Sequence, residues 1–348
     1  MAVFLQVITL FLLIFCGFFS AKGKLVDENG ISTLNKIVLY FALPALTLYG
    51  LQKDASPELI HDLILVFFIS LAIMILSGLI AYFLYRSEPN ERRSVLTNLS
   101  MLSNSAYMGY PVVIATLGED MLIYAVVFVG AFNLMCWTFG SFFFGGISAI
   151  QPKKLLTNPS LIAVLVGLVL FLTGWRLPGF INDALSMMGN VTTPLAMFVI
   201  GARLIDLRFA HLQDWKLLLA CALRLIIFPA AVLLLRFTGL PAAVVSVLYI
   251  CTAMPCAATT AMQSEMYHCD NSLASRGVAL STAFSILTLP LMLLPISQQV
   301  KMPRWVGYAL YPLHLVVLIA LEAALAQPIH TENLINACLL YTSDAADE

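Results

Sequence analysis

The stretch Ser103-Asn104-Ser105-Ala106-Tyr107-Met108-Gly109-Tyr110-Pro111 decides the fold, because polar and helix-breaking residues interrupt an apolar segment long enough to span a membrane. Proline has no N–H donor and its ring clashes with the preceding turn, so Gly109 and Pro111 predict a helix break here. In hydrocarbon such a break is tolerated only where protein covers it or water reaches it. The alternative is a kinked helix packed on its neighbours, since proline and glycine are common in membrane helices.

A second interrupted segment lies in the other half of the chain and reads Thr252-Ala253-Met254-Pro255-Cys256-Ala257-Ala258-Thr259-Thr260. Each interrupted segment is the fourth apolar segment of its half. The second apolar segments also match, because Asn35 precedes Pro44 in one and Asn190 precedes Pro194 in the other. We expect Pro44 and Pro194 to break their helices as well. Two matching pairs predict an internal repeat.

Composition places the chain among polytopic membrane proteins. It is 61% hydrophobic and 11% charged, with a mean hydropathy of +0.93. The net charge of −1 predicts no nucleic-acid partner. No hydrolase, zinc-protease or nucleotide-binding motif is present, so we expect neither an enzyme nor a metal or cofactor site. The cysteines form no CxxC pair and are expected to be free thiols.

The apolar segments predict ten spans on the basis that about 20 apolar residues cross a bilayer. Residues 1–147 form the first five-span repeat, 148–159 a cytoplasmic linker and 160–298 the second repeat. No positive region precedes the first segment, which is therefore interpreted as a membrane helix rather than a signal peptide. The predicted spans are 3–21, 34–52, 60–85, 95–117, 121–147, 160–177, 181–204, 215–238, 240–266 and 273–296.

Basic residues predict the orientation of the spans. Connections after odd-numbered spans hold twelve lysines and arginines, and those after even-numbered spans hold three. The odd connections are therefore expected in the cytoplasm, with the N-terminus outside. We expect a bacterial inner-membrane protein. Arg224 lies about two turns into the eighth span, where snorkelling to the inner face is a more favoured interpretation than substrate binding.

Five spans in each half require the second repeat to enter the membrane upside down. The half-helices beginning at Pro111 and Pro255 are then expected to meet near the middle of the bilayer, each with unpaired N–H groups and a partial positive charge. Such a point suits a carboxylate. The candidate substrate-binding residues are Asn104, Tyr110, Pro111, Asn133, Thr252, Pro255 and Thr259.

Two of the remaining polar features have a structural alternative. Asn133 in the fifth span can equally form a hydrogen bond between helices. Glu265 is the acid closest to either interrupted segment, but a solvated helix end is the favoured interpretation. Glu119, Asp120 and Asp270 also lie at span ends, so no acid is predicted within a span.

Four segments together resemble the auxin efflux carrier family, which includes PIN-type exporters and bacterial malate and malonate permeases. They are Phe41-Ala42-Leu43-Pro44, the stretch 103–111, Lys154-Leu155-Leu156-Thr157-Asn158-Pro159 and Thr193-Pro194 to Ile200-Gly201.

This resemblance implies an all-α protein of ten transmembrane helices, in two inverted five-helix repeats with crossed broken helices, like the bile-acid sodium symporter fold. It implies elevator-type transport of an organic anion, with spans 1, 2, 6 and 7 as the scaffold and the other six as the moving part. Asn104 and Asn133 match the family's substrate-contacting asparagines. A homodimer is compatible with this reading.

The C-terminal segment departs from the family. Residues 299–337 contain an extra apolar run, 306–326, and within them residues 302–326 resemble the C-terminal part of TraX-like membrane proteins. Residues 338–348 read like a translated sequencing adapter. We expect a chimeric tail, with a true eleventh helix and polar tail as the alternative.

Two other functions remain as alternatives. An anion-binding sensor of the same fold is one, and a membrane acyltransferase using His314 as a base is a weaker one.

Overall fold

The computed structural model describes residues 2–150, 153, 156–206 and 214–293, and the tail predictions for 299–348 lie outside this part. The described part is helical, and its extended pairing is one isolated antiparallel bridge between Ser103 and Cys256. The first-half helices are α1 (Ala2–Lys22), α2 (Glu28–Ile37), α3 (Leu43–Gly50), α4 (Pro57–Leu84), α5 (Asn90–Met101), α6 (Tyr110–Leu117), α7 (Leu122–Met135) and α8 (Ser141–Gly145). The second-half helices are α10 (Pro159–Thr173), α11 (Gly179–Asn190), α12 (Thr192–Arg203), α13 (Trp215–Ala222), α14 (Phe228–Leu233), α15 (Ala242–Ala253), α16 (Thr259–Met266) and α17 (Asn271–Met292).

Six helical segments are long and apolar enough to cross a membrane, which makes the chain a multi-pass membrane protein. Each of the ten predicted spans overlaps helix, and the fourth and ninth overlap two helices separated by a short non-helical segment. The six segments are Glu28–Gly50, Pro57–Leu84, Glu119–Gly145, Gly179–Arg203, Trp215–Phe237 and Asn271–Met292. The shorter apolar helices are Ile8–Lys22, Ser105–Leu117, Pro159–Thr173 and Ala242–Ala253.

Side-chain caps fix where several of these helices begin. Ser56 accepts a hydrogen bond from the amide of Leu59 at 3.1 Å, just before Pro57 opens α4. Asn158 accepts one from Leu161 at 3.1 Å, just before Pro159 opens α10. A polar cap followed by proline satisfies or removes amides that a helix start leaves unpaired.

The four residues predicted to break helices, Pro44, Gly109, Pro111 and Pro194, do not do so. Pro44 and Pro111 each follow a π-helical turn, Val38–Ala42 and Ser105–Gly109, and each is the second residue of the next α-helix. Gly109 ends the second turn with helical backbone angles. The wider turn accommodates the ring and the missing N–H, so the helix continues through the proline.

Pro194 also lies inside a helix, as the third residue of α12. The backbone irregularity is confined to Val191, which separates α11 from α12 and itself has near-helical angles of φ −70° and ψ −21°. Pro194 has no N–H group, so the carbonyl of Asn190 lacks its usual helical donor. The resulting distortion of the helix is confined to Val191.

The first true break precedes its predicted position. Helix α5 ends at Met101, and the chain runs through Leu102, with φ −93° and ψ 119°, to Asn104 before helix resumes. The half-helix therefore starts at Ser105 rather than at Pro111. The second break covers residues 254–258 between α15 and α16 and includes Pro255, as predicted.

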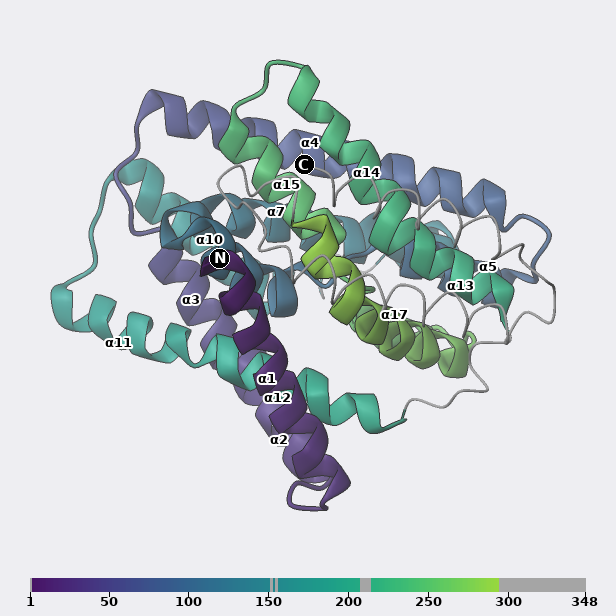
Figure 1. Ribbon diagram of the computed structural model, residues 1–348. Helices are drawn as coiled ribbons and strands as arrows, with labels where there is room; N and C mark the ends of the chain where they lie inside the picture. Colours follow the sequence, from purple (N-terminus) through teal and green to yellow (C-terminus); the bar gives the residue numbers. More distant parts are fainter. Residues whose placement is uncertain (1, 151–152, 154–155, 207–213, 294–348) are drawn as a thin grey trace, which may run out of the picture. The chain divides into compact units, whose positions relative to one another are not determined.

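Helices α1 and α12 pack along each other with their backbones in contact (Figure 1). A Cβ added at Gly17 would lie 2.0 Å from the carbonyl oxygen of Phe198, and one added at Gly201 would lie 1.8 Å from that of Ile14. We call this contact the α1–α12 seam. Only glycine permits so close an approach of two helix backbones.

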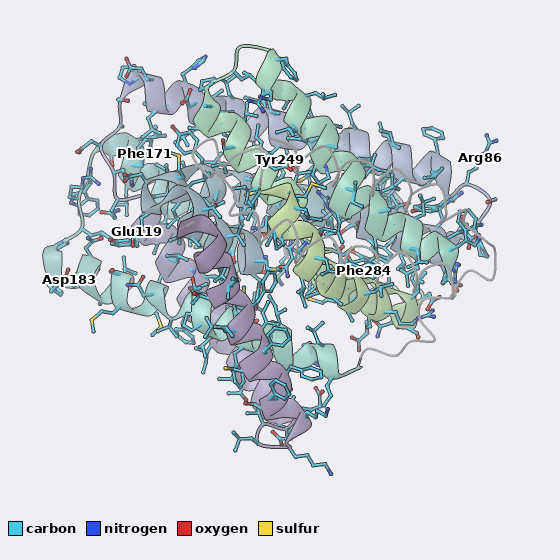
Figure 2. The ribbon with its side chains drawn as sticks, in the orientation of Figure 1. Arg86, Glu119, Phe171, Asp183, Tyr249 and Phe284 are labelled. Carbon is cyan, nitrogen blue, oxygen red and sulfur yellow. The ribbon has the colours of Figure 1, made fainter. Side chains whose placement is uncertain are left out.

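Charged residues lie at opposite ends of the helices. Glu119 and Asp183 are at one end of the described part and Arg86 is at the other (Figure 2). Apolar side chains such as Phe68, Leu165 and Leu172 are exposed on the helices between. An apolar outer surface between polar ends is the arrangement that a bilayer requires.

Candidate functional site

The two broken segments meet and pair with each other. The amide of Asn104 donates to the carbonyl of Pro255 at 2.8 Å, and the amide of Ala257 donates to the carbonyl of Leu102 at 2.9 Å. These bonds flank the bridge between Ser103 and Cys256. Each break thus satisfies backbone groups of the other, which a lipid environment demands. We call this pairing the crossover.

Four helix ends converge on the crossover. The first parts, α5 and α15, bring their carbonyl ends, while the second parts begin at Ser105 and Thr259 with their amide ends. Helix ends carry partial charges of about −0.5 and +0.5 respectively. Among the described residues, no backbone acceptor is found for the amides of Ala106, Tyr107, Ala258 or Thr259. Unpaired donors therefore remain at both amide ends.

A buried arginine side chain contacts the carbonyl ends of α5 and α15. Arg224, from the π-helical turn Leu223–Ile227 between α13 and α14, donates to the carbonyl oxygens of Ser100 at 3.2 Å and Met101 at 2.7 Å. It also donates to the carbonyl of Thr252. Only 2% of this residue is exposed, so it does not snorkel to the surface as predicted. The carbonyls released by the two breaks hold it in place.

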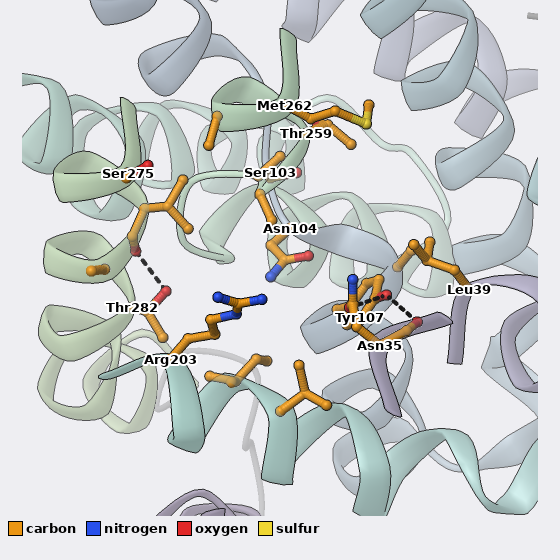
Figure 3. A pocket seen from close by; sticks show the side chains of 18 of the residues that line it. Asn35, Leu39, Ser103, Asn104, Tyr107, Arg203, Thr259, Met262, Ser275 and Thr282 are labelled. Carbon is orange, nitrogen blue, oxygen red and sulfur yellow. Dashed lines mark hydrogen bonds between the residues drawn. The ribbon is translucent and has the colours of Figure 1, made fainter. Parts of the chain in front are cut away.

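A cavity of about 660 Å³ lies against the amide side of the crossover (Figure 3). Residues from both breaks line it, together with residues of α2, α7, α12, α16 and α17. Its lining combines amide and hydroxyl groups with apolar side chains. The uncharged polar members are Asn35, Ser103, Asn104, Ser105, Tyr107, Asn133, Asn158, Ser160, Thr259, Asn271, Ser272, Ser275 and Thr282, and the apolar members include Leu39, Leu43, Phe132, Val199, Ile200 and Met262.

Three of the predicted binding residues line this cavity: Asn104, Asn133 and Thr259. The Asn104 backbone belongs to the crossover, while its side chain points into the cavity (Figure 3). Asn133 donates through Nδ2 to the carbonyl of Val129 at 2.9 Å, within its own helix. Its amide oxygen therefore stays available as an acceptor on the cavity wall.

The other four predicted binding residues lie outside the lining. Tyr110 is 1% exposed, and its hydroxyl lies 3.4 Å from Thr47 Oγ1. Pro111 is buried in α6, one turn beyond the half-helix start. Pro255 and Thr252 act through their carbonyls, which accept from Asn104 and Arg224. For Tyr110 and Pro111 the displaced first break explains the outcome, because it turns this part of the half-helix away from the cavity.

The sequence reasoning missed several residues of the lining. Tyr107 donates to Asn35 Oδ1 at 2.7 Å and joins α2 to the first crossover segment (Figure 3). Arg203 and Arg276, which were also missed, supply charged groups of the lining, as does Glu265, which was interpreted as part of a solvated helix end. Arg203 also pairs with Glu28 at 3.0 Å. These charges lie at span ends, where solvation explains them equally well, so the sequence carried no distinguishing signal.

No group of metal-ligating side chains is found within the described ranges. The cysteines in this part of the chain are free thiols. His314, considered as a catalytic base, lies outside it. The cavity offers hydrogen-bonding side chains and the fixed partial charges of the helix ends.

Comparison with known proteins finds membrane transporters. The family model described as "Membrane transport protein" matches residues 2–149 and 143–293. An uncharacterized transporter of Methanocaldococcus jannaschii is 27% identical over 300 residues, which cover 82% of this chain and 96% of the relative. An uncharacterized transporter of Methanothermobacter thermautotrophicus is 30% identical over 295 residues, which cover 82% and 95%.

Proposed function

The chain belongs to the membrane transport protein family, the auxin efflux carriers whose motifs it carries, and from this premise we propose that it transports a small organic anion, a mono- or dicarboxylate. One observation carries the proposal: unpaired amides at the starts of two half-helices border one cavity. Oriented amides and helix N-termini bind carboxylates without a buried lysine or arginine.

The lining suits an anion with an apolar body. Asn104 and Thr259 stand beside the two amide ends, and Asn133 of α7 lines the same cavity. Phe132, Val199 and other apolar side chains form the rest of the wall. A carboxylate held at the crossover would then place its carbon skeleton against these side chains, which adds affinity through burial.

Inverted repeats account for the packing of the helices. Span 1 packs on span 7 through α1 and α12, while span 6 packs on span 2 through α10 and α3. If each span is replaced by its counterpart in the other half (1 by 6 and 2 by 7, and the reverse), the first pair becomes the second. The crossover follows the same rule, because α5 contacts α17 and α15 contacts α7. This pairwise exchange supports ten spans in two repeats, the second one inverted.

We assign α1 to α3 and α10 to α12 to a scaffold and the remaining helices to a moving part. Contacts between the two groups include polar pairs near or outside the cavity, Asn35 with Tyr107, Thr47 with Tyr110 and Lys53 with Asp120. Hydrogen bonds and an exposed ion pair break at low cost compared with a packed apolar core. Such an interface suits elevator-type alternating access.

The distribution of basic residues predicts the side of the membrane on which the cavity opens. Asn158, Arg203, Glu265 and Arg276 line it at span ends that are predicted to be cytoplasmic. The conformation is then inward-open, in a cytoplasmic membrane and with the N-terminus outside. A homodimer through the scaffold is compatible with this assignment.

Counterflow in proteoliposomes tests the proposal. Vesicles loaded with unlabelled carboxylate are diluted into labelled carboxylate, using acetate, lactate, malonate and malate as probes. Accumulation above the level of protein-free vesicles supports transport. Binding detected by thermal shift without counterflow would indicate an anion sensor, and the absence of both would overturn the anion assignment.

A further inference from the structure

Arg224 carries a charge in the middle of a membrane helix bundle without a carboxylate partner in the described structure. A charged side chain buried in this way is costly, and membrane proteins retain one where it has a function. Within the described residues its hydrogen bonds run to backbone carbonyls: two belong to α5 and one to α15.

These carbonyls lie at the ends of their helices. Ser100 and Met101 are the last two residues of α5, and Thr252 is the next-to-last residue of α15. Helix C-termini carry unsatisfied carbonyls and a partial charge of about −0.5 each. Two such ends facing one another repel, and together they balance about one positive charge. One guanidinium supplies that charge.

We infer that Arg224 is a positioning residue that acts as a built-in cation between the two helix C-termini and so holds the crossover in register. Its planar fork presents several donors at fixed angles and can therefore bond two helix ends at once, which a spherical ion or an ammonium group does less well. The consequence for the transported anion, given next, rests on the proposed function. With the negative ends neutralised within the protein, the positive amide ends at the cavity remain uncompensated and are left to the substrate.

Chemical replacement of the cation tests this inference. In Arg224→Ala the side chain is removed and space for a small planar cation is left. We expect its Tm to fall by at least about 5 °C. A few millimolar guanidinium chloride should restore half or more of that loss, and choline chloride at the same ionic strength should not. The matched control is Arg236→Ala, an exposed arginine near the other end of the same predicted span, whose Tm should respond to neither salt.

Two further variants separate charge from packing. Arg224→Lys keeps the charge, and its Tm should lie between those of Arg224→Ala and the wild type. Arg224→Met keeps the apolar stem without the charge and should resemble Arg224→Ala. If Arg224→Ala yields no folded protein, recovery of Arg224→Lys but not Arg224→Met carries the same conclusion.

The inference is overturned if Arg224→Met is as stable as the wild type, or if guanidinium restores Arg224→Ala no better than choline does. These measurements need no substrate. Guanidinium rescue together with failed carboxylate counterflow would therefore keep the built-in cation and reject the transport proposal.

Discussion

The α1–α12 seam and the crossover are built from similarly apolar helices but solve opposite problems. At the seam, glycines let two helices touch backbone to backbone, and both chains stay helical through the contact. At the crossover both helices are interrupted, and groups from one break pair with the other. The seam leaves no room for a ligand, whereas the crossover leaves unpaired donors beside a cavity.

The seam is therefore expected to contribute mainly to stability, and the crossover mainly to function. Close packing without polar groups resists movement, because any displacement loses many contacts at once. A crossover held by a few hydrogen bonds keeps its geometry while presenting groups that a ligand can satisfy. Damage at the seam should therefore remove the folded protein, and damage on the cavity side of the crossover should remove only transport.

The largest effect is expected for Gly201→Ala at the seam. The new Cβ would lie 1.8 Å from the Ile14 carbonyl oxygen, so the backbones must separate. We expect a loss of about 3 kcal/mol or more, seen as a lower Tm and a lower yield of monodisperse protein. Gly179→Ala is the matched control, since its Cβ would meet no atom within 4 Å. Equal stability of the two variants would contradict the seam.

Asn104→Ala should abolish counterflow while leaving the protein folded. The Asn104 amide still donates to Pro255, because alanine keeps the backbone, and only the group facing the cavity is lost. Labelled carboxylate uptake and Tm are measured on the same preparation. Asn190→Ala, at the exposed end of α11, is the control and should transport normally. Uptake by Asn104→Ala at the wild-type rate would remove Asn104 from the site.

Asn133→Ala should weaken substrate binding about tenfold, which corresponds to about 1.4 kcal/mol for one lost hydrogen bond. The loss is smaller than at Asn104, since Asn133 spends one donor on its own helix. A concentration series of counterflow gives the half-saturating concentration. An unchanged value would leave Asn133 with a structural role.

The smallest effect is expected at the exposed pair of Lys53 and Asp120, which belongs to neither region. Asp120 has a side chain that is 88% exposed, and solvent-exposed pairs contribute little. Asp120→Asn should change the counterflow rate less than twofold, and raising the salt concentration should reduce even this difference. A larger change would assign the pair a role in opening and closing the cavity.

Much of the fold was accessible from the sequence, because the length of the apolar segments is set by the thickness of the bilayer. The predicted spans overlap the observed helices, and the segment around Pro255 is broken as predicted. The helix breaks predicted at prolines were wrong where the preceding turn is π-helical and therefore wider than an α-helical turn. Pro44 and Pro111 both follow π-helical turns, and the wider turn lets the helix continue through each proline.

The candidate site was accessible only in part. Asn104 and Thr259 border breaks that composition reveals, and both line the cavity. Tyr110 looked equally suitable in sequence, but its side chain is directed to Thr47. The direction of a side chain depends on how many residues separate it from the break, and an error of a few residues rotates it to another face.

The sequence by itself determined that the chain enters a membrane, where its helices run and which family it belongs to, because these follow from residue hydropathy and local motifs. Only the tertiary structure decided that the two breaks pair, that Arg224 serves both carbonyl ends, and that the amide ends border one cavity. Those features join residues more than 100 positions apart, as with Arg224 and Ser100, whose separation is 124. These contacts depend on how whole helices pack against one another, so they cannot be predicted from the local sequence.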